Sequence, residues 1–161
     1  LTYCYSTNRK AAVPFSVTYS SFSGKTKQHL SKGNCESWNL SLNGQPYEEL
    51  FPLEELVYLT AESENVMETF DRSKVYIIGG IVDRNRFKGI THEKAKKQGI
   101  LTMRLPIGEH LKTAGTKVLT VNHVFEILSR FSESGNWSET LLKVLPLRKS
   151  AEAIEKMDTT K

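Results

Sequence analysis

The stretch VYIIGGIVDRNRFKGITHEKAKKQGILTMRLP, residues 75–106, decides the fold of this chain. Residues 75–78 are continuously apolar and rich in β-branched and aromatic side chains, a pattern that predicts a strand buried on both faces of a parallel sheet. Gly79 and Gly80 follow directly. Because glycine has no Cβ, the backbone there can take a positive φ or let a ligand come close. The pattern therefore predicts a strand that ends at a ligand-permissive loop.

The second half of this stretch predicts a helix and a further strand. Thr91 has the side chain of an N-cap for a helix over residues 92–98, and Gly99 stands where that helix would end. Residues 100–105 have the character of a strand, which Pro106 ends. Strand, helix and strand in this order form a βαβ unit, and such units bind ligands beyond the carboxyl ends of their strands.

The loop between the first strand and the helix carries Asp83, Asn85 and Lys88 in the spacing D-x-N-x-x-K. This spacing lies in a polar, turn-prone segment. The βαβ interpretation places Asp83 at the carboxyl edge of the sheet, where a ligand would bind.

A second strand and helix precede this unit, which predicts a sheet built by repeated β-to-α crossovers. Residues 56–60 (LVYLT) form the second strongly apolar strand, and residues 64–71 predict a short helix that buries Val66, Met67 and Phe70. The predicted fold class is α/β, with an open, mostly parallel sheet flanked by helices.

Shorter elements are expected on both sides of these units. They are a helix end at residues 1–12, a strand at 15–20, a basic helix at 25–32, a strand at 38–42, a helical turn entered at Pro52, a polar loop at 107–116, a strand at 118–121, a helix at 123–131 capped by Asn122 and ended by Gly135, and a helix at 137–145. Residues 1–149 are expected to form one domain and residues 150–161 a loosely held polar tail.

The composition is that of an ordinary globular protein. The 161 residues are 39% hydrophobic and 25% charged, which suffices for one domain with a sizeable core. The longest apolar run, around residues 75–82, is far too short to cross a membrane. Cys4 and Cys35 form no C-x-x-C pair, which favours a reducing compartment over a disulfide framework. The histidines show no ligand spacing, so no metal site is expected.

The net charge of +4 is unevenly distributed. Residues 46–71 contain eight acidic residues and no Lys or Arg, whereas residues 84–104 contain seven basic residues and the single acid Glu93. A basic patch beside a ligand pocket suits a polyanionic partner such as nucleic acid. A solvated helix face is the alternative.

Four motifs in this sequence resemble those of the tRNA (guanine-9-N1)-methyltransferase family, a branch of the SPOUT methyltransferases. They are YLTAES at residues 58–63, IGGIVDRNRFKG at 78–89, RLPI at 104–107 and KVLTVNHVFEIL at 117–128. Their order and spacing match those of the family, and the resemblance extends from CYSTNR near the start to LPLRK near residue 149.

The resemblance implies a SPOUT-type fold whose C-terminal segment threads through a loop to form a trefoil knot. Knots are rare, and no pattern in the sequence predicts one by itself. The family domain opens with a strand that would lie upstream of Leu1, so the first strand of the family fold is expected to be missing.

The activity that the resemblance implies is transfer of a methyl group from S-adenosylmethionine to N1 of guanosine at position 9 of tRNA. The cofactor would lie among the loops that follow the strands. Its implied binding residues are Leu59, Thr60, Gly79, Gly80, Leu105, Pro106, Ile107, Val121, Asn122 and His123. The last two would offer backbone N–H groups from a helix start, for which a plain helix cap is the alternative.

Asp83 matches the proposed proton acceptor of the family. N1 of guanine carries a proton that must leave before the nitrogen can attack the sulfonium methyl group, and a carboxylate within reach can take it. An unperturbed Asp, with a pKa of about 3.9, is a weak base for this task, and neighbouring cations would lower that pKa further. Three roles stay open for Asp83: a general base, an orienting acceptor for the guanine edge, or an Asx turn that braces the loop. Members of the family with D-x-N at this point act on guanine, so the resemblance implies guanine in preference to adenine.

Basic and polar side chains would hold the tRNA. Arg84, Arg86 and Lys88 would contact phosphates, which sets affinity rather than specificity, and Asn85 would contact the base or brace the loop. Turning a stacked base into the site costs a few kcal/mol, roughly, and contacts with distant phosphates would offset that cost. The distant candidates are Arg9, Lys25 and Lys27, for which exposed lysines without a function are the alternative.

Two other functions compete with this one. The first is a non-catalytic tRNA- or RNA-binding module with a vestigial cofactor site, and the second is a small-nucleotide-binding α/β domain. The methyltransferase interpretation expects tRNA as partner, no membrane, no metal and a monomer. It places the protein in the nucleus or the cytoplasm, with the mitochondrion as the alternative.

Overall fold

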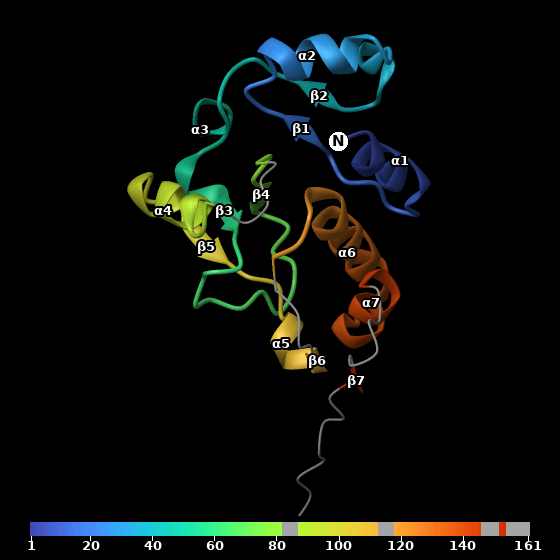
Figure 1. Ribbon diagram of the computed structural model, residues 1–161, viewed down its shortest axis with the longest axis vertical. Helices are drawn as coiled ribbons and strands as arrows, with labels where there is room; N and C mark the ends of the chain where they lie inside the picture. Colours follow the sequence, from blue (N-terminus) through green and yellow to red (C-terminus); the bar gives the residue numbers. More distant parts are fainter. Residues whose placement is uncertain (82–86, 113–117, 146–151, 154–161) are drawn as a thin grey trace, which may run out of the picture.

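The computed structural model describes residues 1–81, 87–112, 118–145 and 152–153. At its centre lies a three-stranded parallel sheet in the order β4-β3-β5 (Figure 1). Its strands are β3 (Leu56–Leu59), β4 (Val75–Ile78) and β5 (Leu101–Met103). The helix α4 (Ile90–Lys97) follows β4 and precedes β5, so the predicted βαβ unit is confirmed, with β3 lying between its two strands.

The three strands end at the same level. Leu59, the last residue of β3, pairs with Ile78 on β4 and with Met103 on β5. The strand β3 is buried along its whole length because it has a neighbour on each side. The burial predicted for both faces of β4 is wrong, since β4 is only half-buried. It forms an edge of the described sheet, where fewer side chains cover it.

Alternating side chains of the sheet build two cores. Val57 and Leu59 point into the larger core, and Leu56 and Tyr58 point to the opposite face. The elements that cover the sheet are α6 (Val121–Ser134) and α7 (Trp137–Val144) on the first face, and α3 (Tyr47–Leu50) and α4 on the second. Helices therefore flank the sheet on both sides, as the α/β prediction requires (Figure 1).

Residues 64–71 do not form the predicted helix. They run irregularly along the end of β5, where the N–H of Met67 donates to the carbonyl of Arg104 at 2.9 Å. The N–H of Arg104 in turn donates to the carbonyl of Asn65 at 2.8 Å. These non-local bonds replace the local bonds of a helix, so tertiary pairing overrides the helical spacing. Of the three core residues predicted in this segment, only Met67 is fully buried.

The helix α4 starts earlier than predicted. Gly89 occupies the N-cap position with a left-handed φ of 72°, a conformation that glycine adopts without steric cost. Thr91 therefore lies inside the first turn and is not the N-cap. Gly99, with a φ of 69°, follows the helix as predicted.

The polar loop predicted at residues 107–116 is partly ordered into elements. A helical turn, α5 (Ile107–His110), leads into β6 (Leu111–Lys112). Ile107 and Leu111 are buried in the larger core, and these two apolar anchors bring the polar segment back onto the domain. Residues 113–117 lie outside the described part of the chain.

The start of α6 also corrects the sequence prediction. Residues 118–120 form no strand, and the helix begins at Val121. Thr120 takes the N-cap position, so Asn122 lies in the first turn and is not the cap. The predicted four-residue strand, residues 118–121, was too short for its pattern to distinguish a strand from the approach to a helix.

The helical hairpin of α6 and α7 agrees with prediction. Gly135 ends α6 with a φ of 64°, and the side chain of Asn136 caps α7 by accepting a hydrogen bond from the N–H of Glu139 at 3.1 Å. The rings of Phe131 and Trp137 stack with centroids 3.7 Å apart, which joins the two helices in the core.

The N-terminal part forms a smaller unit whose first helix packs on α6. The predicted strands at residues 15–20 and 38–42 are present but short, and they pair in parallel as β1 and β2. The elements of this unit are α1 (Thr2–Lys10), β1 (Thr18–Tyr19), α2 (Gly24–Ser31), the 3₁₀ turn η1 (Cys35–Ser37) and β2 (Ser41–Leu42). A second 3₁₀ turn, η2 (Leu53–Glu55), follows α3 and leads directly into β3.

Three further features concern the predicted tail, the cysteines and the membrane. Within residues 150–161, β7 (Glu152–Ala153) pairs antiparallel with β6. Cys4 and Cys35 are both buried and free. Among the described residues, no helix has the length and apolar character needed to span a bilayer.

Candidate functional site

The carboxyl ends of the three parallel strands form the candidate site. Because the strands end at one level, Thr60, Gly79 and Arg104 each begin a loop at the same edge of the sheet. The N–H of Thr60 donates to the carbonyl of Met103 at 2.9 Å, which continues the pairing of β3 and β5 to this edge. Two of these positions, Thr60 and Gly79, were predicted to bind the cofactor.

A chain of hydroxyl hydrogen bonds ties the start of α4 to the end of β3. The Oγ1 of the buried Thr60 donates to a carboxylate oxygen of Glu62 at 2.7 Å and lies 3.0 Å from the Oγ1 of Thr91. A hydroxyl has one proton to donate. Since the Thr60 proton goes to Glu62, Thr91 is the donor toward Thr60. The sequence did not indicate this role for Thr91 or for Glu62.

Gly79 is required by packing, whereas Gly80 leaves space. A Cβ on Gly79 would lie 2.9 Å from the hydroxyl of Tyr58 and 3.0 Å from a methyl carbon of Thr91. A Cβ on Gly80 would meet no atom within 4 Å. The close approach thus joins the ends of β3 and β4 to α4, and the exposed Gly80 offers open backbone to a ligand.

The buried side chain of Tyr58 packs against Gly79 in this arrangement. Its side chain is buried and meets the ring of Tyr47 edge-on, with centroids 6.1 Å apart. Burial, followed by the effect of Tyr47 and Glu48, raises the pKa of Tyr58 to about 12. Tyr58 is therefore protonated near neutral pH and is no candidate for a general base.

The loop after β5 packs tightly against the core. Pro106 and Ile107 are buried, Leu105 is half-buried, and the N–H of Ile107 donates to the carbonyl of Leu105 at 2.9 Å. Leu105 and Ile107 belong to the same apolar cluster as Leu59. The predicted loop residues after β3 and β5 are thus brought together, with their side chains largely committed to the core.

The first turn of α6 lies beside this cluster, because Leu119 and Val124 pack against it. Val121, Asn122 and His123 are half-buried there. The side-chain oxygen of Asn122 accepts a hydrogen bond from the Thr120 hydroxyl at 2.8 Å, so it is already in use. The first N–H groups of a helix have no partner within the helix and suit a carboxylate or a hydroxyl of a ligand.

Arg104 is committed to the protein and not to a ligand. Its guanidinium forms two parallel hydrogen bonds with the carboxylate of Glu109, at 3.0 and 2.6 Å. The bond with Glu109 raises the pKa of Arg104 above its usual value. This bidentate pair fixes α5 against the end of β5.

The predicted substrate residues are divided between the described and the undescribed parts. Asp83, Arg84, Asn85 and Arg86 lie within residues 82–86, outside the described part of the chain. The described basic candidates are all exposed; they are Lys88 before α4, Arg9 on α1, and Lys25 and Lys27 on α2. Figure 1 places α2 at the end of the molecule away from α5 and α7.

His92 is a feature that sequence reasoning missed. It lies in the first turn of α4, one residue after Thr91, and its Nδ1 is buried without a hydrogen-bond partner among the described residues. No spacing with another histidine or cysteine singled it out. Among the described residues, no group of three His, Cys, Asp or Glu side chains is placed to hold a metal ion.

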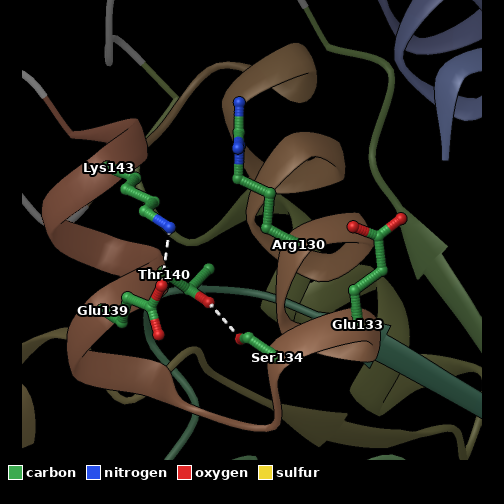
Figure 2. A pocket seen from close by; sticks show the side chains of 6 residues that line it. All are labelled: Arg130, Glu133, Ser134, Glu139, Thr140 and Lys143. Carbon is green, nitrogen blue, oxygen red and sulfur yellow. Dashed lines mark hydrogen bonds and ion pairs between the residues drawn. The ribbon is translucent and has the colours of Figure 1, made fainter. Parts of the chain in front are cut away.

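A hollow of about 270 Å³ between α6 and α7 is a poor candidate for the site (Figure 2). Lys143 forms an ion pair with Glu139 at 2.6 Å, and Ser134 and Thr140 share a hydrogen bond of 3.1 Å. These groups satisfy one another, so little is left for a ligand. The hollow is lined by Arg130, Glu133, Ser134, Glu139, Thr140 and Lys143.

The fold and the loops at the strand ends indicate the general class of this protein. A parallel α/β sheet with an open glycine and a polar loop at its carboxyl edge is typical of proteins that bind a nucleotide-like ligand there. Residues 1–150 match the family model described as tRNA (guanine(9)-N(1))-methyltransferase TRM10/TRM10A, and the chain belongs to that family.

Individual relatives agree with this assignment. The chain is 41% identical over 152 residues to the rat tRNA methyltransferase 10 homolog A, and this match covers 92% of this chain and 45% of the relative. It is 43% identical over 155 residues to the tRNA (guanine(9)-N1)-methyltransferase of Schizosaccharomyces pombe, covering 92% of this chain and 51% of that protein. The chain thus spans about half the length of the curated relatives it matches.

Solved structures show the same fold. The crystal structure of full-length spTrm10 in complex with SAH matches with a TM-score of 0.82 and 40% identity, over 90% of this chain and 81% of that one. The crystal structure of spTrm10(74) matches with a TM-score of 0.84 and 41% identity, with the same coverage. The predicted α/β class with a parallel sheet is confirmed.

Proposed function

We propose that this chain transfers a methyl group from S-adenosylmethionine to N1 of guanosine at position 9 of tRNA. The observation that carries the proposal is the level carboxyl edge of β4-β3-β5, with open backbone at Gly80, in a fold shared with an SAH-bound relative. The curated yeast relatives are named for the same reaction at about 40% identity.

The residues at this edge fit the cofactor. Gly80 leaves room for an adenosyl group to approach the backbone, and the buried turn at Leu105 to Ile107 supplies an apolar wall. The first turn of α6, at Val121 to His123, would offer N–H groups to a carboxylate or a ribose hydroxyl. When bound, the cofactor supplies an electrophilic methyl group on a sulfonium.

Asp83 would act on the purine. As a general base it would take the proton from N1, which would leave on that nitrogen the lone pair needed to accept the methyl group that the cofactor would supply. As an orienting acceptor it holds the N1–H edge while water takes the proton. Tyr58 is not available for this step, because its pKa of about 12 keeps the phenol protonated.

Basic side chains would hold the tRNA. Residues 1–35 contain five Lys or Arg and no Asp or Glu, so the N-terminal unit carries positive charge along its length. Arg9, Lys25 and Lys27 of this unit are exposed and would bind phosphates, as would Lys88 beside the site. Such contacts would offset the cost of turning the target base out of its stack.

Other parts of the proposal follow from family membership. They are the C-terminal trefoil knot of a SPOUT fold, guanine in preference to adenine, contacts from Arg84, Asn85 and Arg86 to the substrate, action as a monomer, and a nuclear or cytoplasmic location.

The decisive experiment compares Asp83→Asn with Asp71→Asn on unmodified tRNA and labelled S-adenosylmethionine. Removing a general base lowers turnover by about 10²- to 10⁴-fold, so Asp83→Asn is expected to lose turnover while its calorimetric affinity for S-adenosylhomocysteine stays unchanged. Asp71 is exposed and caps a turn through Ser73, so its variant should retain turnover.

Three results would contradict the proposal. Unchanged turnover in Asp83→Asn would remove this carboxylate from the mechanism. Methylation at a nucleotide other than position 9 would refute the substrate assignment. Tight tRNA binding without any heat from S-adenosylhomocysteine would identify a non-catalytic RNA-binding module instead.

A further inference from the structure

A hollow of about 460 Å³ lies between the start of α1 and one face of α2. Residues 1–3 line it from α1, and Lys25, Thr26, His29 and Leu30 line it from α2. Its volume is within the range of about 300–1,000 Å³ that is usual for ligand pockets. None of these residues belongs to the strand ends of the candidate site, so the α1–α2 hollow is a separate feature of the surface.

Tyr3 presents an aromatic ring at this hollow. It is 76% exposed, and its side chain forms no hydrogen bond, ring stack or cation–π contact within the part of the chain that the structure describes. Tyr5, by contrast, stacks on Trp38 with ring centroids 4.4 Å apart. Residues two positions apart on a helix point to different sides. The Tyr5 stack therefore fixes α1 to the N-terminal unit and leaves the Tyr3 ring outside the packing.

Positive charge lies beside this ring. Lys25 and His29 stand one turn apart on the same face of α2, and both are exposed. Residues 1–35 contain five Lys or Arg and no Asp or Glu, so no acidic side chain from this part of the sequence neutralises Lys25. A single exposed aromatic residue is common, but a ring beside a cation in a hollow suits single-stranded nucleic acid. Its bases stack on the ring and its phosphates meet the cation.

The walls of the hollow are fixed to the rest of the protein. The hydroxyl of Tyr19 donates to the carbonyl of Leu1 at 3.0 Å, and Leu30 is buried in the small core of the N-terminal unit. The helix α1 packs on α6, and the N–H of Ala12 donates to a carboxylate oxygen of Glu133 at 2.8 Å. The hollow therefore keeps its place relative to the domain that carries the candidate site.

We infer that the α1–α2 hollow binds an unstacked nucleotide of the tRNA, other than the one that is methylated. The Tyr3 ring stacks on the base, and Lys25 binds the adjoining phosphate. The inference rests on the proposed function, because it takes tRNA as the partner, and it adds a second point of attachment away from the strand ends. Stacking of this kind is independent of base identity, because every base has a π face.

The first test compares the affinities of Tyr3→Ala, Tyr3→Phe and Val13→Ala for unmodified tRNA. Loss of one base stack weakens binding by roughly 5- to 150-fold, so Tyr3→Ala should bind more weakly by that factor. Tyr3→Phe keeps the ring and should retain the affinity. Val13→Ala is the matched control, because Val13 is 73% exposed in the same unit and does not line the hollow.

A double-mutant cycle tests whether Tyr3 and Lys25 hold the same nucleotide. Once the base is no longer stacked, its phosphate is no longer positioned at Lys25. The loss in the double variant Tyr3→Ala with Lys25→Gln should therefore be smaller than the product of the separate losses. Lys10→Gln is the control, because it removes an equal charge from an exposed position at the other end of α1, and its loss should multiply with that of Tyr3→Ala.

A spectroscopic variant reports the stack directly. Tyr3→Trp should bind tRNA as tightly as the parent chain, and the fluorescence of the new indole should be quenched as tRNA saturates. The parent chain, titrated in parallel, provides the signal of Trp38 and Trp137 to subtract. Poly-glutamate, a polyanion without bases, should leave the indole unquenched. Circular dichroism of each variant checks that the exposed substitution leaves the fold intact.

The inference is overturned by unchanged tRNA affinity in Tyr3→Ala, by an equal loss in Tyr3→Phe, or by losses of Tyr3→Ala and Lys25→Gln that simply multiply. Quenching of the indole by poly-glutamate, no quenching by tRNA, or a parent chain that binds no tRNA would also overturn it.

Binding is measured without methyl transfer, so the two proposals can fail separately. If the chain methylates tRNA and Tyr3→Ala binds it as tightly as the parent, the inference alone fails. If Tyr3→Ala loses tRNA but the parent chain methylates nothing, the methyltransferase proposal alone fails.

Discussion

Gly79→Ala is the substitution to which this structure is expected to be most sensitive at the candidate site. The new Cβ would lie 2.9 Å from the hydroxyl of Tyr58 and 3.0 Å from a methyl carbon of Thr91, both closer than normal contact. The φ of Gly79 is not in the left-handed region, so the effect comes from these contacts and not from backbone strain.

Neither the Tyr58 nor the Thr91 side chain can move away without losing contacts. Tyr58 is 4% exposed and has a rigid ring packed against Tyr47, and Thr91 is held by its hydrogen bond to Thr60. Overpacking of this kind costs about 1–3 kcal/mol. For a chain of this length each kcal/mol lowers Tm by about 2–4 °C, so a cost of about 2 kcal/mol, the middle of that range, lowers Tm by roughly 4–8 °C.

Thermal unfolding followed by circular dichroism measures this decrease, and Gly80→Ala is the matched control. A Cβ at Gly80 has no atom within 4 Å, so its Tm should stay within about 2 °C of the parent. Combining Gly79→Ala with Tyr58→Phe removes the hydroxyl at 2.9 Å and should recover part of the loss, which a double-mutant cycle quantifies.

Equal Tm values for Gly79→Ala and Gly80→Ala would refute the packing account. So would a double-mutant cycle with zero coupling between Gly79→Ala and Tyr58→Phe. Equal Tm values would mean that the two glycines are equivalent, and zero coupling would mean that the contact with the Tyr58 hydroxyl contributes nothing to the loss of stability.

Two further predictions concern stability away from this contact. Asn136→Ala removes the side-chain cap of α7, so it should lower the free energy of unfolding, measured in urea titrations, by about 1 kcal/mol. Asn122→Ala is the control, because Asn122 lies inside the first turn of α6 and its substitution should change that free energy much less. The folded state raises the pKa of Tyr58 to about 12, above the value near 10 of an unfolded chain. Its contribution to stability is complete below pH 10 and is lost as the pH rises from about 10 to 12; urea titrations across this range should show a shallower decline for Tyr58→Phe.

The sheet was predictable because its strands are continuous apolar runs. Residues 56–60 and 75–78 have no helical spacing that competes with the strand pattern. The segment after β3 was not predictable in this way. Val66, Met67 and Phe70 have spacing compatible with a helix, yet the backbone of Met67 pairs with Arg104, a partner far along the chain that no local pattern reveals.

The candidate site was predicted in outline but not in its contacts. Thr60 and Gly79 follow apolar strands, so their place at the carboxyl edge could be inferred from sequence alone. The role of Thr91 could not, because a threonine before a helical pattern usually indicates an N-cap. Its hydroxyl instead reaches Thr60, 31 residues earlier in the chain, and such a pair depends on how β3 and α4 pack.

These contacts explain how a polar loop could be positioned for catalysis. Asp83 lies four residues after Gly79 and eight before Thr91, and both of those residues are fixed in the scaffold, the first by packing and the second by its hydrogen bond to Thr60. Methyl transfer requires the reacting atoms to be aligned closely, and misplacement by about 1 Å can cost 10²-fold in rate. Under the proposed function, Gly79 and Thr91 would fix the two ends of the loop and leave Gly80 open to the cofactor. Thr91→Val removes the hydroxyl at nearly constant volume. Under the proposed function it should therefore lower the turnover of methyl transfer to tRNA while changing Tm little.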